Sequence, residues 1–171
     1  MAKKLDVYLA RIYDIVHSRR GVTVEAYNSR GSSNEHSAAV RARLRYWDDS
    51  MLQLTENLIE EDVQLRKEEY VYHYQAQDGS LIFRYDNVPH YPDLPTHPHH
   101  KHVGAGAAER VEATQPPQLT DVLREIDALL TPPQNRRMTD AAAAGYGRGS
   151  PTAVGFRLSN PLPHTRLASS I

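Results

Sequence analysis

The sequence contains no cysteine, which excludes disulfide bonds, thiolate metal sites and a cysteine nucleophile. Long apolar runs are also missing, and no segment approaches the roughly 20 consecutive apolar residues that span a bilayer. The N-terminal segment 1–16 begins with lysines but lacks an apolar central region and a cleavage site, so we predict no secretory signal. Apolar residues make up 40% of the chain, which allows a modest core. We therefore expect a cytoplasmic protein with no membrane association.

The chain also lacks an excess of positive charge, because its formal net charge is −1. Residues 131–171 hold five arginines and one acidic residue, which leaves 15 basic and 20 acidic residues in 1–130, a balance of −5. An acidic domain does not attract nucleic acid as a whole. Any contact with nucleic acid must therefore come from a local basic patch.

Two segments have the spacing of amphipathic helices. Residues 4–18 carry apolar side chains three and four positions apart, and Gly21 marks the expected end. Residues 119–130 carry a second apolar stripe that runs from Leu119 to Leu130, and two prolines follow it. We predict a helix at each place.

Between the two helical segments the pattern is typical of strands. Alternating or apolar runs occupy residues 22–27, 38–47, 51–59, 69–75 and 81–86, separated by turn and loop residues. Asp78 and Gly79 form the strongest hairpin signal. A two-residue turn there pairs residues whose numbers sum to 157, so that Tyr74 faces Phe83 and His73 faces Arg84. The tyrosines and Phe83 then share the core face, and His73, Arg84 and Asp86 share the other face.

The predicted fold class is α+β: an N-terminal helix, an antiparallel meander of four to five strands and a C-terminal helix packed on the sheet. Residues 87–102 contain four prolines and are predicted as a loop. We assign residues 1–130 to the α+β domain. Residues 131–171 are rich in Ala, Gly, Pro and Arg without any period, which predicts a disordered tail.

The loop after the last predicted strand is unusual in composition, since five of the nine histidines lie within residues 90–102. Histidine exchanges protons near neutral pH, and arginine binds phosphate bidentately. Cleavage of RNA by its own 2′-OH needs a base, an acid and a cation near the phosphate. Arg84 is the predicted phosphate ligand, Asp86 the group that orients a histidine, and His90 and His102 the proton-exchanging pair. No metal and no cofactor are required by this scheme.

Each of these residues also has a structural interpretation. Arg84 and Asp86 lie two positions apart on one face, which is equally typical of a structural ion pair. His73 within a strand is more often a packing residue. Arg43 and Arg45 would extend a phosphate-binding patch, although arginines on a strand usually form a solvated face. The segment 97–102 can also be interpreted as a transition-metal site, but it lacks a recognised ligand spacing.

Several motifs occur in order along the chain and resemble the TumE family of toxin–antitoxin toxins. The resemblance covers roughly residues 40–130. The motifs are an aromatic strand (70–75), the Asp78 and Gly79 hairpin, Arg84-Tyr-Asp-Asn87 with Pro89-His90, Pro98-His-His-Lys-His102, and Asp121-Val-Leu-Arg-Glu-Ile126. Within this pattern His97 stands where an aromatic residue is expected.

The resemblance implies a growth-inhibiting bacterial toxin that is neutralised by a cognate antitoxin with a helix-turn-helix DNA-binding domain. It assigns the family pattern to Arg84, Asp86, His90, His99, His100 and His102. The order of a helix followed by a meander also resembles small ribonuclease toxins of the RelE and barnase type, by fold analogy alone.

We therefore predict a metal-independent ribonuclease toxin that cleaves an RNA substrate. The residues expected to bind the substrate are Arg43, Arg45, His73, His99, His100 and Lys101. Two alternatives remain open. One is a toxin without enzymatic activity that binds a cellular target through the histidine loop, and the other is a metal-dependent nuclease that uses residues 97–102.

Overall fold

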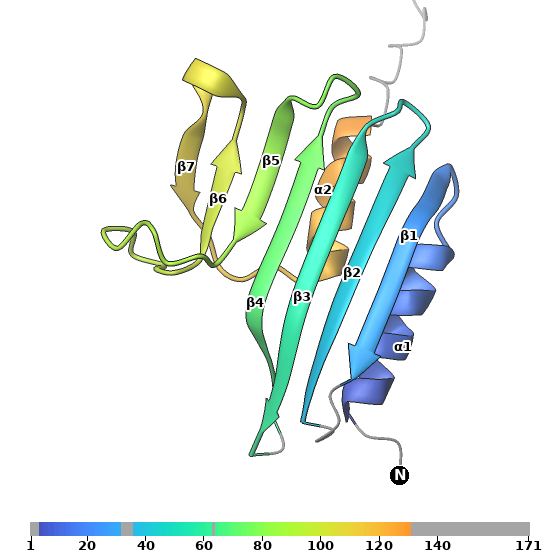
Figure 1. Cartoon of the computed structure of the whole chain (residues 1–171). Coiled ribbons are helices and arrows are strands. Elements are labelled where there is room, and N and C mark those ends of the chain that lie inside the picture. The colour runs from blue at the N-terminus through green and yellow to red at the C-terminus, as the bar shows by residue number, and fades with distance from the viewer. Residues whose placement is uncertain (1–3, 32–35, 63, 131–171) are drawn as a thin grey trace, which may run out of the picture. The chain divides into compact units, whose positions relative to one another are not determined.

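The computed structural model describes residues 4–31, 36–62 and 64–130, which form one sheet and two helices (Figure 1). The elements in chain order are α1 (Lys4–His17), β1 (Val22–Gly31), β2 (Ser37–Tyr46), β3 (Met51–Glu61), β4 (Gln64–Gln75), β5 (Leu81–Asp86), β6 (His100–Val103), a 3₁₀ turn (Gly106–Ala108), β7 (Arg110–Ala113) and α2 (Leu119–Leu130). The prediction for residues 131–171 lies outside the described residues.

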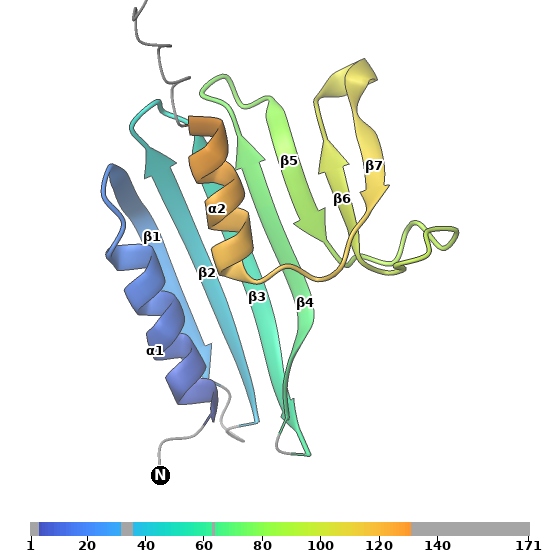
Figure 2. The same ribbon diagram turned by 180° about the vertical axis from the view of Figure 1, so that it is seen from behind.

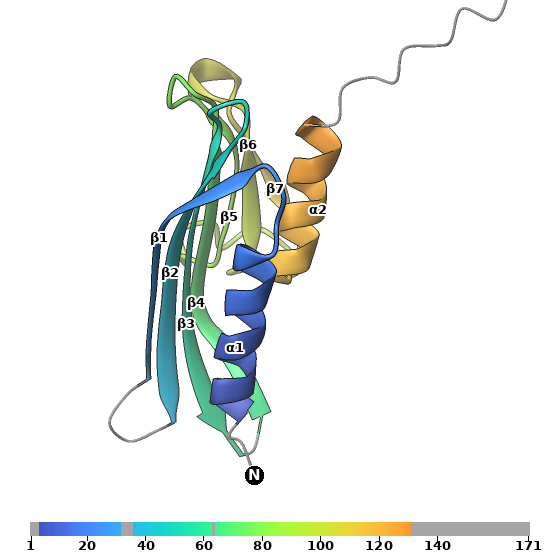
Figure 3. The same cartoon turned by 90° about the vertical axis from the view of Figure 1, so that its right-hand side faces the viewer.

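The sheet is an antiparallel meander in which the strand order equals the sequence order, β1 to β7. Both helices cover the same face of the sheet, as the view from behind and the side view show (Figures 2 and 3). The core lies between the helices and that face. It is made of the inward side chains of β2 to β5, among them Leu44, Tyr72 and Phe83, and the apolar stripes of α1 and α2, among them Ile12 and Ile126. Within residues 4–31, 36–62 and 64–130, no helix covers the opposite face.

The predicted fold class is confirmed. The structure differs from the prediction in the number of strands, because β6 and β7 follow the loop and lengthen the sheet to seven. Residues 100–102 were predicted as loop, since His and Lys have no strong preference for strands. Pairing with β5 on one side and β7 on the other supplies the backbone partners that make this segment a strand.

The pairs predicted for the hairpin of β4 and β5 are confirmed away from the turn, where Val71 pairs with Asp86, His73 with Arg84 and Tyr74 with Phe83. Next to the turn the register shifts, because Gln75 pairs with Leu81 and Ala76 N donates to Ser80 O, so the predicted two-residue turn is wrong. Since side chains alternate along a strand, Phe83 lies in the core, whereas Arg84 and Asp86 lie on the face without helices.

One ionised pair lies within the core. Glu56 is fully buried on β3 and accepts hydrogen bonds from the hydroxyls of Tyr8 and Tyr72. Lys67 Nζ lies 3.3 Å from Glu56 Oε1 and also donates to the carbonyl of Pro117 at 3.0 Å. This network links α1, the sheet and the segment that leads into α2.

None of the helices in the described part of the chain has the length and apolar character that crossing a membrane requires.

Candidate functional site

A row of polar side chains crosses the face of the sheet that carries no helix. The register aligns Arg43 on β2 with Gln53, His73, Arg84 and finally His102 on β6. Each of these residues is the direct neighbour of the next on the adjacent strand, so all five belong to one face. The row ends at the densest group of ionisable side chains on this face.

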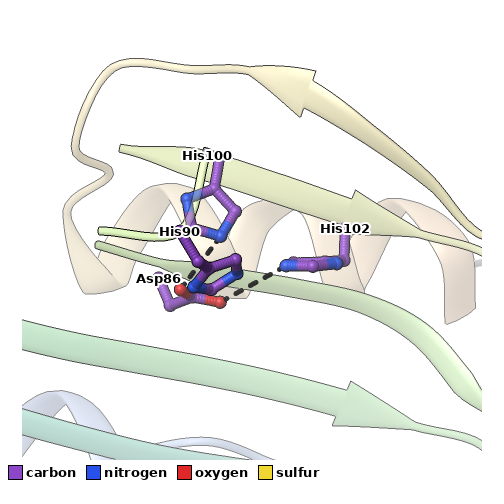
Figure 4. Close-up of side chains that lie close together, drawn as sticks. All are labelled: Asp86, His90, His100 and His102. Atoms are coloured by element: carbon purple, nitrogen blue, oxygen red, sulfur yellow. Dashed lines mark ion pairs between the residues drawn. The ribbon is translucent and has the colours of Figure 1, made fainter. Parts of the chain in front are cut away.

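That group consists of Asp86, His90, His100 and His102, which we call the Asp–His cluster (Figure 4). One donor atom from each residue lies within 4.8 Å of the donor atoms of the other three. Asp86, His100 and His102 are 1–3% exposed, and His90 is exposed. The two strands β5 and β6 supply three members, with Asp86 directly opposite His100 and His102 two positions further along β6, and the loop between the strands adds His90.

Arg84 binds the cluster from one side. Its Nε donates to Asp86 Oδ2 at 2.7 Å, and a terminal guanidinium nitrogen donates to His102 Nε2 at 2.8 Å. The other carboxylate oxygen, Asp86 Oδ1, accepts a hydrogen bond from the backbone N–H of Val88 at 3.1 Å. The side chain of Arg84 is one-third exposed. The guanidinium of Arg84 therefore contacts both the cluster and solvent.

His100 and His102, the two buried histidines, are each oriented by a hydrogen bond at Nδ1, the ring nitrogen that faces away from the cluster. His100 Nδ1 lies 2.8 Å from the carbonyl of Pro98, and His102 Nδ1 lies 2.6 Å from Glu109 Oε1. Both oxygens only accept hydrogen bonds, so each Nδ1 carries a proton. Burial lowers the pKa of His102, and Arg84 acts in the same direction, while Glu109 opposes the change. In the neutral ring each Nε2 then presents a lone pair to the cluster.

His100 Nε2 is an unpartnered buried atom. It lies 3.0 Å from Asp86 Oδ1, but the two atoms lack the geometry of a hydrogen bond, and Nε2 has no hydrogen-bond partner within the described part of the chain. In the neutral tautomer this contact places a lone pair against a carboxylate oxygen, which is unfavourable. A buried polar atom without a partner usually indicates a missing ligand, ion or water.

Local hydrogen bonds hold the loop between β5 and β6 in place. The side chain of Asn87 accepts from the N–H of Tyr70 and donates to the carbonyl of Glu68, both at 2.9 Å, where the pairing of β4 with β5 ends. Further along, Tyr91 packs its ring edge-on against His100, with centroids 4.9 Å apart. The prolines and these contacts fold the loop over the cluster and bury it.

Glu109 reaches the cluster through the tight connection between β6 and β7. Gly104 adopts a positive φ of 85°, and a Cβ there would lie 2.9 Å from the carbonyl oxygen of Ala108. The 3₁₀ turn that follows ends with a hydrogen bond from Glu109 N to Gly106 O at 3.1 Å. The sequence analysis missed Glu109, since it lies seven residues beyond His102 and no local motif links the two.

The structure brings together the four residues predicted to be catalytic, Arg84, Asp86, His90 and His102, and adds His100, which was predicted to bind the substrate. It separates other predicted residues from them. Lys101 lies on the opposite face of β6, where its Nζ pairs with Glu125 of α2 at 2.6 Å.

The remaining histidines and arginines lie elsewhere. The ring of His99 stacks on the ring of Tyr70, and His99 Nδ1 lies 3.1 Å from the hydroxyl of Tyr70. His97 Nδ1 lies 3.1 Å from the carbonyl oxygen of Tyr91. The alternative prediction placed a metal site in residues 97–102. Of the four histidines in that segment, only His100 and His102 belong to the cluster.

Arg43 and His73 lie on the same face as the cluster, and Arg43 is three strands, about 14 Å, from Arg84. Arg45 forms an ion pair with Glu25 on β1 and is already engaged. His73 Nε2 lies 3.1 Å from Gln75 Oε1, and burial lowers the pKa of His73. Of the three, Arg43 and His73 are placed to extend a binding surface from the cluster.

Two cavities in the described part of the chain do not include the cluster in their lining. One of about 530 Å³ includes Lys67, Tyr70 and His99 in its lining. A groove of about 560 Å³ over β1 to β3 includes Arg41 and Arg43. The rings of His90, His100 and His102 pack on one another, with centroids 4.6–5.9 Å apart. A ligand larger than an ion therefore reaches the cluster from the exposed side, at His90 and Arg84.

Comparison with known proteins gives one result. A family model described as "Toxin TumE" matches residues 12–130, which contain the whole Asp–His cluster and both sheet-covering helices except the first turns of α1. Neither a curated protein nor a solved structure gives a significant match.

Proposed function

The chain belongs to the TumE toxin family, and we propose that it is the toxin of a toxin–antitoxin pair that arrests bacterial growth by cleaving RNA in the cytoplasm. The observation that supports cleavage is the contact of Arg84 with Asp86 and His102 on an uncovered sheet face. This places a guanidinium, a carboxylate and imidazoles within hydrogen-bond distance of one another. Such groups are those that phosphodiester cleavage requires.

In this proposal RNA lies along the row from Arg43 to His102. Arg84 binds the scissile phosphate, because its one-third exposed guanidinium has donors left beyond those that bind Asp86 and His102. Arg43 and His73 contact the RNA further along the same face. Asp86 orients the imidazoles, and His90, as the exposed member of the cluster, stands nearest to the incoming 2′-OH.

The predicted partner is an antitoxin with a helix-turn-helix DNA-binding domain, which neutralises the toxin in the cell. A gene next to the one for this chain is expected to encode it. Co-expression with that neighbour is expected to restore growth, and co-purification of the two proteins would establish the pair.

The test of cleavage is RNA incubated with purified, folded and antitoxin-free protein. Arg84→Ala is expected to lower the cleavage rate by about 10²–10³-fold, as the loss of one charge-stabilising donor does in other enzymes. Arg66→Ala is the matched control, because Arg66 pairs with Glu61 on the distant end of the sheet and is exposed. RNA that stays intact with folded wild-type protein would refute cleavage.

The alternative of a toxin that acts by binding alone predicts a different outcome. Substituting His90 or His102 by Gln should then weaken capture of a cellular target although no RNA is turned over. A pull-down that returns only the antitoxin argues against this alternative.

The geometry of the cluster also allows a bound metal ion, because His100 Nε2 lies 3.0 Å from Asp86 Oδ1 and His102 Nε2 lies 3.7 Å from Asp86 Oδ2. The cleavage assay is therefore carried out with and without EDTA. Cleavage that persists in EDTA would support the metal-independent scheme.

A further inference from the structure

We propose that the Asp–His cluster is a binding site for one divalent transition-metal ion of the Zn²⁺ class, held by the carboxylate of Asp86, His90, His100 Nε2 and His102 Nε2. The proposal concerns binding by the purified chain and does not depend on RNA cleavage.

The first argument is the arrangement of donors. Tetrahedral Zn²⁺ with bonds of about 2.0–2.1 Å holds its ligands about 3.3 Å apart. His100 Nε2 lies 3.0 Å from Asp86 Oδ1, and His102 Nε2 lies 3.7 Å from Asp86 Oδ2. All four donors lie within 4.8 Å of one another, so small rotations of the exposed His90 complete the set.

The second argument is how the imidazoles are supported. A histidine that binds a metal usually donates its other ring N–H to a carbonyl or carboxylate, which fixes the tautomer and the ring orientation. His100 does so to Pro98 O and His102 to Glu109 Oε1. Both rings are therefore held with an unprotonated Nε2 near the carboxylate of Asp86.

The third argument is the unpartnered nitrogen. His100 is 1% exposed, and its Nε2 has no hydrogen-bond partner within the described residues although a carboxylate oxygen lies 3.0 Å away. A proton on Nε2 would satisfy this atom, but it would leave the convergence of His90 and His102 on the same carboxylate unexplained. A metal ion satisfies all four donors at once.

The charges of the site favour a cation. Asp86 and the supporting Glu109 carry two negative charges, Arg84 carries one positive charge, and the imidazoles are neutral as ligands, so the site is anionic before an ion binds. Arg84 now donates to His102 Nε2, so the guanidinium must leave that nitrogen when the ion binds. It can do so because it is one-third exposed and keeps its separate bond to Asp86 Oδ2.

The donor set selects the class of ion. Three imidazoles suit Zn²⁺, Co²⁺, Ni²⁺ or Cu²⁺, whereas Mg²⁺ and Ca²⁺ prefer oxygen ligands and higher coordination numbers. The chain has no cysteine to bind the ion by sulfur. We therefore expect Zn²⁺ to bind and Mg²⁺ not to compete with it.

The test is metal titration of the full chain purified without a histidine tag and stripped with EDTA. We expect binding of about one Zn²⁺ per chain. Co²⁺ is expected to give visible absorption bands much stronger than those of the hydrated ion, which reports direct coordination. Asp86→Asn and His100→Gln should each weaken Zn²⁺ binding by more than about 100-fold, since loss of a ligand costs more than loss of its supporting partner.

Two variants keep the test independent of folding. His90→Ala removes an exposed ligand, so its circular dichroism should match that of the wild type while Zn²⁺ binding falls. His99→Gln is the matched control, because His99 precedes His100 but stacks on Tyr70 instead. Wild-type binding well below one ion, or an equal loss in His99→Gln, would overturn the proposal. Stoichiometric binding by protein that leaves RNA intact would uphold the site and refute the proposed function.

Discussion

Removing the carboxylate of Glu109 should weaken metal binding without touching a ligand. Glu109 Oε1 accepts the Nδ1 proton of His102 at 2.6 Å and so fixes which nitrogen of His102 faces the cluster. In Glu109→Ala the ring can rotate or exchange its tautomer, and both changes withdraw Nε2 from the ion. Glu109→Gln keeps an oxygen that accepts the same proton but removes the negative charge.

The size of the effect follows from the place of Glu109. Losing the partner that supports a ligand lowers metal affinity by about 10–100-fold, or about 1.4–2.7 kcal/mol. The side chain of Glu109 is 38% exposed, so water can replace part of its hydrogen bond. We therefore expect Glu109→Ala near the lower end, at about tenfold, and Glu109→Gln at a smaller loss of about threefold.

The assay is competition for Zn²⁺ between the protein and a chromophoric chelator. Glu112→Ala is the matched control, because Glu112 is similarly exposed on β7 but pairs with Arg110. Unfolding curves of the metal-free proteins should stay close to that of the wild type for both positions. Unchanged Zn²⁺ affinity in Glu109→Ala, or an equal loss in Glu112→Ala, would refute the idea that Glu109 orients His102 for a metal.

Three further substitutions test other parts of the structure. Arg84→Gln should raise Zn²⁺ affinity by about tenfold or more, while the rate of RNA cleavage falls. The reason is that the charged hydrogen bond to His102 Nε2, worth about 1.5–3 kcal/mol, is lost and the nitrogen becomes available to the ion. Weaker Zn²⁺ binding would contradict this. Lys67→Met leaves the charge of Glu56 buried without its ion pair and should cost about 3–5 kcal/mol in urea unfolding; a loss below about 1 kcal/mol would mean that the pair is not ionised. Gly104→Ala puts a side chain on a left-handed backbone and brings its Cβ against the carbonyl of Ala108, so it should lower the free energy of unfolding in urea by at least about 1–2 kcal/mol. It should also weaken Zn²⁺ binding, because the turn positions Glu109. A variant as stable as the wild type would count against the strained turn.

Much of the sheet could be predicted because its signals are local. The hairpin signal at Asp78 and Gly79 located the pairing of β4 with β5, and the period of two assigned each side chain to a face. The irregularity at Gln75, which shifts the register next to the turn, had no signal in the sequence. The prediction of residues 100–102 as loop had a different cause. These residues have little preference for strands, and their conformation depends on pairing with β5 and β7, which no local pattern reports.

The same gap explains what was missed at the site. A loop conformation for residues 100–102 gives no reason for the three side chains to point in different directions, so all three were predicted to belong to the site. In the strand, Lys101 points to the face that the helices cover, where it pairs with Glu125. The alternation of His, Lys, His and Val was the available signal for a strand. Glu109 and the burial of the cluster depend on how the loop and the next turn fold, so sequence alone did not indicate them.

The order of the strands has a consequence for how the donor set is assembled. Since each strand pairs with the next one in the sequence, all four donors come from one uninterrupted stretch, from the end of β5 to β6. The pairing of β5 with β6 and the loop between them carry all four donors, β7 completes the pairing of β6, and α1 supplies none of the donors. A substitution in α1 or β1 to β4 therefore changes no ligand of the site, whereas one deletion between β5 and β6 removes several at once.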